Sequence, residues 1–113
     1  MDSLKRIIQS LNETKLEDLN IYETKNITPY FDYAIIVTAN SSRQLSAAVS
    51  KLKKDTEDNK IELRGIEGLE GGSWVLIDFN DVIVNIFIEE ERAKYDLDKL
   101  WRTLPQIEYN TLL

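Results

Sequence analysis

The segment WVLIDFNDVIVNIF, residues 74–87, constrains the fold more than any other part of the chain. Two apolar runs flank Asp78-Phe79-Asn80-Asp81, which is the pattern of two strands joined by a tight turn. With Asn80 and Asp81 as its central residues, the turn is predicted to be type I′, which needs positive φ at both positions. One face of this hairpin is then entirely apolar and is predicted to face the core; it carries Val75, Ile77, Phe79, Val82, Val84 and Ile86.

The other face of the hairpin is mixed in character. It carries Trp74, Leu76, Asp78, Ile83, Asn85 and Phe87. Two large aromatics with a few polar groups are typical of a protein-binding patch, in which the aromatics anchor the partner and the polar groups orient it. The alternative is that a helix of the same chain covers this face and that Asp78 lies at the sheet margin. A slip of one residue in the strand pairing would exchange the faces of one strand.

The rest of the chain predicts further helices and strands. The apolar residues Leu4, Ile7, Ile8 and Leu11, and later Leu45, Ala48, Val49 and Leu52, recur at helical spacing. Strands are predicted to begin at Leu19 and to span 33–38 and 61–66, and a helix to span 89–95, with Asp96 capping a last turn. This α-β-β-α-β-β-β-α order predicts an α/β fold with a mixed sheet of about five strands flanked by helices. At 113 residues, we expect one domain spanning residues 1–113.

The amino-acid composition limits which catalytic and metal-binding sites the chain could form. The chain has no cysteine and no histidine, so thiolate chemistry and the commonest general base and metal ligand are unavailable. Asp78 and Asp81 are three residues apart across a turn, whereas a two-metal carboxylate site on a strand needs a spacing of two. We therefore predict no catalytic residues, no metal and no cofactor. No apolar run approaches the roughly 18 residues of a membrane span. Because a chain without cysteine suits the cytosol, we also expect a cytoplasmic protein.

The net charge of the chain indicates which kind of partner it could bind. A formal charge of −6 argues against sequence-specific nucleic-acid binding, which relies on clustered Lys and Arg. It favours a basic protein partner, whose encounter an acidic surface would steer. The alternative is that the acidity serves only solubility.

Further motifs surround the hairpin in a fixed order. Asp32-Tyr33 and Ser41-Ser42-Arg43-Gln44 come first, Glu67-Gly68 precedes the hairpin, and Glu91-Arg92, Tyr95-Asp96-Leu97 and Leu100-Trp101 follow it. Together with WVLIDFNDVIVNIF, these blocks resemble the ribosomal silencing factor, or Iojap-like, family over most of the chain. Two positions depart from the family pattern. Asn80 replaces a glycine of the turn, and Asn85 replaces a histidine, so that hydrogen bonding is retained but titration is lost.

The resemblance implies a nucleotidyltransferase-like fold that lacks the catalytic set, and it implies a function. Members of the family bind the large ribosomal subunit through its fourteenth protein, block subunit joining sterically and repress translation under nutrient limitation. Members often form homodimers when isolated, so a homodimer is possible here as well.

The resemblance and the mixed face together suggest roles for seven residues. We expect Trp74 and Phe87 to anchor the partner, Asp78 and Asn85 to orient it, and Asp81 and Glu67 to meet basic groups at the rim. Arg92 is a further candidate for partner contact, although an arginine on this helix could instead bond local carboxylates.

Two other functions stay open. One is a nucleotide-binding or nucleotidyltransferase-type enzyme, which rests on fold analogy alone. The other is a dimeric adaptor for another basic protein. Magnesium-dependent nucleotide binding would support the first, and recovery of a partner from lysate without ribosomes would support the second.

Overall fold

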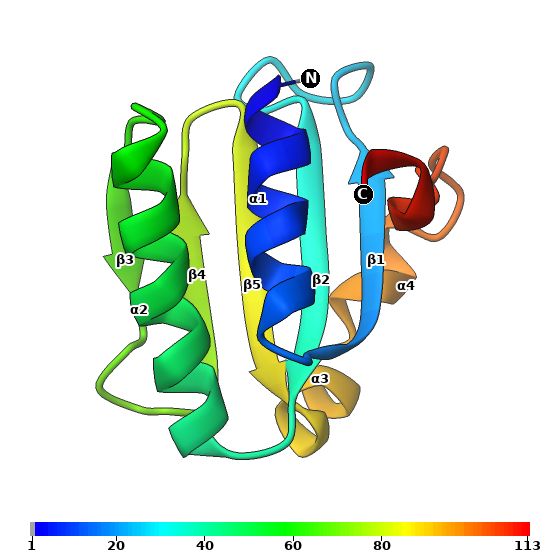
Figure 1. The fold of residues 1–113 in the computed structure, drawn as a ribbon. Coiled ribbons are helices and arrows are strands. Elements are labelled where there is room, and N and C mark those ends of the chain that lie inside the picture. The colour runs from blue at the N-terminus through cyan, green and yellow to red at the C-terminus, as the bar shows by residue number, and fades with distance from the viewer. Residues whose placement is uncertain (1) are drawn as a thin grey trace.

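The computed structural model describes residues 2–113, which form five strands, four α-helices and one short 3-10 helix (Figure 1). In chain order these are α1 (Asp2–Glu13), β1 (Glu17–Glu23), β2 (Tyr33–Ala39), α2 (Ser42–Asp58), β3 (Gly65–Glu67), β4 (Trp74–Asp78), β5 (Val82–Ile88), α3 (Glu89–Tyr95), α4 (Leu97–Trp101) and η1 (Tyr109–Leu112). No helix within the described residues has the length and apolar character needed to cross a membrane.

The strands form one mixed sheet in the order β1-β2-β5-β4-β3. β2 and β5 are parallel, and the other neighbouring pairs are antiparallel. The predicted mixed sheet of about five strands flanked by helices is therefore confirmed. The C-terminal segment covers the β1 edge, where the amide of Glu23 donates to the carbonyl of Pro105 at 2.9 Å and that of Ile107 to the carbonyl of Ile21 at 3.0 Å.

Helices α1 and α2 lie side by side across one face of the sheet (Figure 1). The apolar stripes predicted for both helices pack there against the apolar face of the hairpin. Members of this core include Leu4, Ile7, Leu45, Leu52, Ile77 and Val84, each at most 1% exposed. Each aliphatic side chain buried in this way contributes about 1.5–3 kcal/mol to folding.

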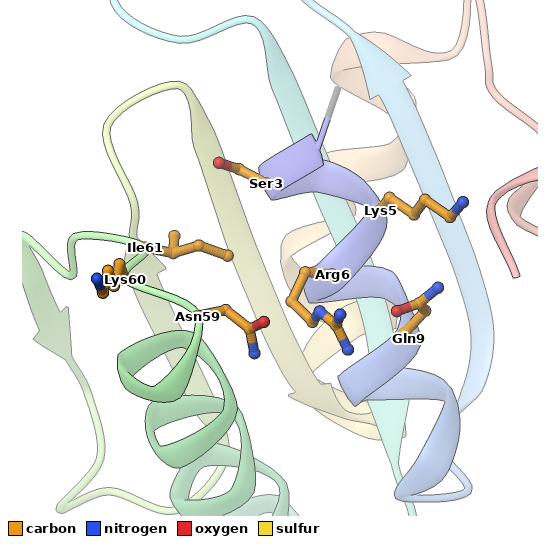
Figure 2. Close-up of a pocket in the computed structure, with 7 residues that line it drawn as sticks. All are labelled: Ser3, Lys5, Arg6, Gln9, Asn59, Lys60 and Ile61. Carbon is orange, nitrogen blue, oxygen red and sulfur yellow. The ribbon is translucent and has the colours of Figure 1, made fainter.

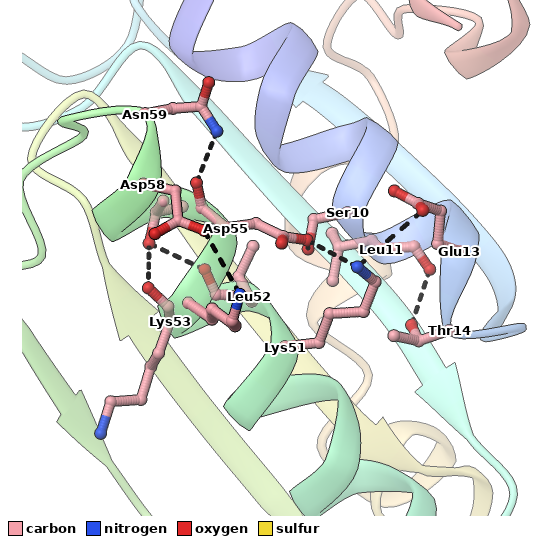
Figure 3. Close-up of polar contacts among 12 residues, drawn as sticks. Ser10, Leu11, Glu13, Thr14, Lys51, Leu52, Lys53, Asp55, Asp58 and Asn59 are labelled. Atoms are coloured by element: carbon pink, nitrogen blue, oxygen red, sulfur yellow. Dashed lines mark hydrogen bonds and ion pairs between the residues drawn. The ribbon is translucent and has the colours of Figure 1, made fainter.

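Polar contacts join the facing sides of α1 and α2 (Figure 3). The hydroxyl of Ser10 on α1 donates to Asp55 Oδ2 on α2 at 2.7 Å, and Lys51 Nζ donates to the same oxygen at 2.9 Å. Hydrogen bonds from Lys51 and Ser10 lower the pKa of the Asp55 carboxyl. Lys51 also lies 3.9 Å from Glu13 of α1, so the two helices are held together outside the core as well as within it.

The start of α2 is capped by side chains of the motif Ser41-Ser42-Arg43-Gln44. Ser41 is the N-cap, and its hydroxyl accepts from the amide of Gln44 at 3.0 Å. The side-chain oxygen of Gln44 in turn accepts from the amide of Asn40 at 2.6 Å. The first bond satisfies an amide that the first turn of a helix leaves free, and the second ties the residue before the N-cap to the same turn.

Three local predictions are wrong. The hairpin turn is not type I′, because only Asn80 has positive φ, at 77°. The third strand begins at Gly65 rather than Ile61, because the amide of Ile61 bonds back to the carbonyl of Thr56 at the end of α2. Asp96 adopts a left-handed conformation between α3 and α4 and makes no side-chain cap bond.

Candidate protein-binding site

Strand pairing places the six predicted residues of the mixed face together. Trp74 lies opposite Phe87, Leu76 opposite Asn85, and Asp78 opposite Ile83, which confirms the predicted register. Helices α1 and α2 cover the other face, and the α3–α4 segment covers part of this one. Beneath that segment Tyr22, Ile36 and Phe87 form a small buried cluster, against which Trp74, Leu97 and Trp101 pack. The mixed face is therefore covered at one part and open at another.

Trp74 stands at the border between these two parts. Its indole Nε1 donates to Asn85 Oδ1 at 3.0 Å. Its ring stacks on Phe87 at 4.8 Å between centroids and contacts Tyr95 of α3 at 4.9 Å. Asn85 is only 1% exposed and Phe87 is fully buried. These two side chains lie beneath Trp74 and are not themselves surface, so direct contact with a partner, as predicted for both, does not match their burial.

The open part of the face contains a shallow apolar pocket of about 230 Å³, lined by Glu67, Gly68, Trp74 and Leu76. Tyr95, which is 48% exposed, flanks Trp74. We call these five residues the Trp74 surface. Gly68 has a φ of +88°, and a Cβ added there would lie 2.2 Å from the carbonyl oxygen of Trp74. A glycine is therefore required where the β3–β4 loop passes the tryptophan.

The acidic residues of the hairpin turn have different positions. Asp78 is half-buried, and its Oδ1 accepts from the amide of Asn80 at 2.7 Å, which fixes the turn. The side-chain oxygen of Asn80 accepts a hydrogen bond from Arg64 Nη1 at 2.7 Å. Asp81 is exposed, and its carbonyl accepts from the amides of Asp32 and Tyr33. Asp81 is thus free to meet a partner through its carboxylate, whereas one oxygen of Asp78 is already engaged.

Arg92 is held within the chain. Its Nε and Nη2 donate to the two carboxylate oxygens of Asp98, at 2.9 and 3.2 Å, and its Nη1 donates to the carbonyl of Asp18 and the hydroxyl of Thr38. The side chain is 13% exposed. These bonds match the alternative in which Arg92 binds a local carboxylate, because its donors are directed inward; contact of Arg92 with a partner stays a prediction. Arg92 joins the α3–α4 segment to β1 and β2.

The same carboxylate receives two more hydrogen bonds, from Asn20 Nδ2 at 3.0 Å and from the hydroxyl of Tyr22 at 2.6 Å. Burial alone would raise the pKa of Asp98, but the bonds from Arg92, Tyr22 and Asn20 and the charge of Arg92 outweigh it, so its pKa is lowered. Burial, followed by the bond to Asp98, raises the pKa of Tyr22 to about 12. The network therefore keeps Asp98 ionised and Tyr22 protonated at neutral pH.

Among the side chains that the structure describes, no three Asp or Glu residues are arranged to hold a metal ion. Comparison with known proteins gives a match over the whole chain. The model of the family described as "Ribosomal silencing factor during starvation" matches residues 1–113. The chain belongs to this family.

Individual relatives agree with this assignment. The ribosomal silencing factor of Halalkalibacterium halodurans is 36% identical over 105 residues, which cover 93% of this chain and 90% of the relative. A crystal structure from Chromobacterium violaceum is similar with a TM-score of 0.85 and 31% identity, covering 88% of this chain and 83% of that one. A mouse relative named "Mitochondrial assembly of ribosomal large subunit protein 1" is 26% identical over 98 residues, 84% of this chain and 43% of its own length.

Two residues that shape the site were not predicted from the sequence. Tyr95 was not among the predicted site residues, yet it is half-exposed beside Trp74. Asp98 was not singled out, although its carboxylate organises the network beneath α3 and α4. Its spacing of six residues from Arg92 does not match an i, i+4 helical pair, because the left-handed Asp96 breaks the helix between them.

Proposed function

We propose that this ribosomal silencing factor binds the large ribosomal subunit through its fourteenth protein, blocks joining of the small subunit and so represses translation when nutrients are limiting. Membership of a family described as silencing the ribosome during starvation supports this function. The name of the mouse relative, which refers to the large subunit, supports the choice of subunit. We further propose that the protein acts in the cytoplasm.

The observation that carries the proposal is the way Trp74 is fixed. Phe87 supports its ring from below, Tyr95 flanks it, and Asn85 holds its indole nitrogen. A large aromatic held in one orientation beside an apolar pocket loses little conformational entropy on binding. Such aromatics are typical hot spots of protein interfaces.

The charge around the Trp74 surface fits a basic partner. Glu67 lines the pocket and is exposed, Asp81 is exposed at the hairpin turn, and the whole chain carries a net charge of −6. A ribosomal protein lying on RNA is a suitable partner for such a surface, because electrostatic complementarity raises the association rate and selects against acidic partners.

The structure changes the roles that we assign within the site. Trp74 and Leu76 are the proposed anchors, with Tyr95 beside them, and Glu67 and Asp81 are the proposed rim charges. Phe87 and Asn85 position Trp74 from below, because both are buried. Asp78 shapes the turn, and its second carboxylate oxygen is the atom proposed to meet the partner.

Arg92 acts at one remove from the interface. Its bonds to Asp98, Asp18 and Thr38 hold α3 against the sheet, and α3 carries Tyr95. We therefore assign Arg92 as a positioning residue for the Trp74 surface.

Calorimetric titration of the protein with the isolated fourteenth protein of the large subunit tests the site. We expect Trp74→Ala to weaken binding by about 30-fold or more, which corresponds to a hot spot of about 2 kcal/mol. Tyr30→Ala is the matched control. Tyr30 is 79% exposed and is not among the residues proposed to contact the partner, so its truncation leaves the Trp74 surface itself unchanged. Equal loss for both variants, or none for Trp74→Ala, would contradict the assignment.

If a homodimer covers the Trp74 surface, dimerisation is expected to compete with ribosome binding. Following the molar mass against concentration while the ribosomal protein is added tests this point. Conversion of dimer into a one-to-one complex supports competition, and a dimer that binds while intact shows that the two surfaces are separate.

A further inference from the structure

A polar hollow of about 500 Å³ opens between the start of α1 and the end of α2 (Figure 2). It is lined by Ser3, Lys5, Arg6, Gln9, Asn59, Lys60 and Ile61. Figure 2 shows Arg6 on α1 and Asn59 at the end of α2 facing one another across it. Its volume lies within the range of small-molecule sites, about 300–1,000 Å³. The proposed function makes no use of this hollow.

The charge of the hollow is opposite to that of the protein. Three of its lining residues are cationic, and none of the lining that the structure describes is a carboxylate, although the chain carries a net charge of −6. Earlier along α2, by contrast, Lys51 pairs with Asp55 at 2.9 Å and Lys54 with Asp58 at 3.5 Å. The described lining of the hollow thus brings three cations together without a carboxylate.

The backbone at Lys60 is a second, independent observation. The amide of Ile61 donates to the carbonyl of Thr56 at 2.8 Å, and the amide of Lys60 to that of Glu57 at 3.1 Å. These bonds form a Schellman motif, whose left-handed position is usually occupied by glycine. Here Lys60 occupies it with a φ of 59°. The chain thus keeps a cationic side chain at a position that favours glycine, at the edge of the hollow.

We propose that this hollow binds the phosphate chain of a small polyphosphorylated molecule, such as a nucleoside triphosphate. Arg6 offers a planar fork of donors that matches phosphate oxygens, and Lys60 adds a point charge at the margin. Figure 2 shows the ammonium group of Lys5 directed away from α2, so Lys5 contributes only through its charge at longer range. Ser3 and Gln9 supply neutral donors. The described lining contains one large apolar side chain, Ile61, and no aromatic on which a base could stack, so the phosphates are the recognised part.

The hollow and the Trp74 surface lie on opposite sides of the sheet. α1 and α2, which form the hollow, pack on the apolar face of the hairpin, whereas Trp74 belongs to the other face. Binding of phosphate in the hollow and binding of the ribosome at the Trp74 surface are therefore separate, and Trp74→Ala should leave the affinity for phosphate unchanged.

Calorimetric titration without magnesium, at low and at physiological salt, tests the proposal. The probes are inorganic tripolyphosphate, ATP and a short single-stranded RNA. We expect saturable one-to-one binding of tripolyphosphate and ATP that weakens as salt is added. We expect similar affinity for the two probes, because the phosphate chain is the recognised part; ATP binding more than 10-fold tighter than tripolyphosphate would contradict this. Absence of saturable binding, or RNA binding 100-fold tighter than either probe, would overturn the proposal.

Variants locate the site. Arg6→Gln should weaken tripolyphosphate binding by about 10-fold or more, whereas Lys54→Gln, an exposed lysine of α2 outside the hollow, should change it by less than about twofold. Lys60→Gly should lower the affinity several-fold while leaving the melting temperature equal or higher, because glycine suits the left-handed position. An unchanged affinity for Lys60→Gly, or equal losses for Arg6→Gln and Lys54→Gln, would contradict a built site.

Discussion

Replacing Asp98 with alanine should destabilise the protein by about 3 kcal/mol. The carboxylate accepts hydrogen bonds from Asn20, Tyr22 and two nitrogens of Arg92. Breaking one partner of a buried ion pair costs about 3–5 kcal/mol, because the remaining charge is left without compensation. The lower end applies here, since the side chain of Asp98 is 25% exposed and Arg92 keeps its bonds to Asp18 and Thr38.

Urea unfolding at pH 7 measures this loss, and thermal unfolding should show a fall in melting temperature of roughly 12 °C for a domain of this size. Asp58→Ala is the matched control. Its partner Lys54 is also well exposed, with side chains 62% and 77% accessible, so its removal should cost less than about 0.5 kcal/mol. If Asp98→Ala unfolds within 1 kcal/mol of wild type, the network does not hold the α3–α4 segment.

The pKa shift of Asp98 adds a pH dependence. Because the pKa of this carboxyl is lowered in the folded state, its contribution is present above the unfolded value of about 4 and is lost as the pH falls through the folded value. The difference in stability between wild type and Asp98→Asn should therefore shrink below about pH 4. A difference that stays constant down to pH 2 would contradict this.

Two further predictions concern Tyr22, which bonds to Asp98, and Gly68, which lies beside Trp74. Burial raises the pKa of Tyr22 to about 12, so the stability that its neutral hydroxyl contributes is fully present below the unfolded pKa near 10 and is lost as the pH rises towards 12. Urea unfolding should therefore show a smaller loss of stability over this pH range for Tyr22→Phe than for the wild type. Gly68→Ala should cost about 3 kcal/mol or more and alter the fluorescence of Trp74, because the new Cβ meets its carbonyl oxygen. Gly65→Ala, whose Cβ would meet nothing within 4 Å, should change stability by less than about 0.5 kcal/mol; equal losses for both glycine variants would refute the steric argument.

The sheet could be predicted from the sequence because its signals are local. Alternation in residues 74–87 fixed the register that pairs Val75 with Ile86 and Ile77 with Val84, since a slip would have exposed apolar side chains. The stripes of α1 and α2 likewise repeat at helical spacing. The predicted strand at Ile61 failed because backbone bonds at the end of α2 use the amide of that residue, and neighbouring residue types do not show this.

The candidate site was predicted only in part. Alternation placed Trp74, Asn85 and Phe87 on one face, but it does not show how far α3 and α4 reach across that face. The burial of Phe87 and the inward bonds of Arg92 depend on Asp98 and Tyr22, which are 76 residues apart in sequence. Contacts of this kind have no local signal, so the division of the mixed face into a supporting part and an open part could not be predicted.

The most direct test of the central claim is a sucrose gradient at physiological salt, in which the protein is mixed with purified large ribosomal subunits before small subunits are added. We predict that the wild-type protein sediments with the large subunit and that joined ribosomes are lost, while Trp74→Ala restores joining. Normal joining in the presence of folded wild-type protein that stays at the top of the gradient would contradict the account.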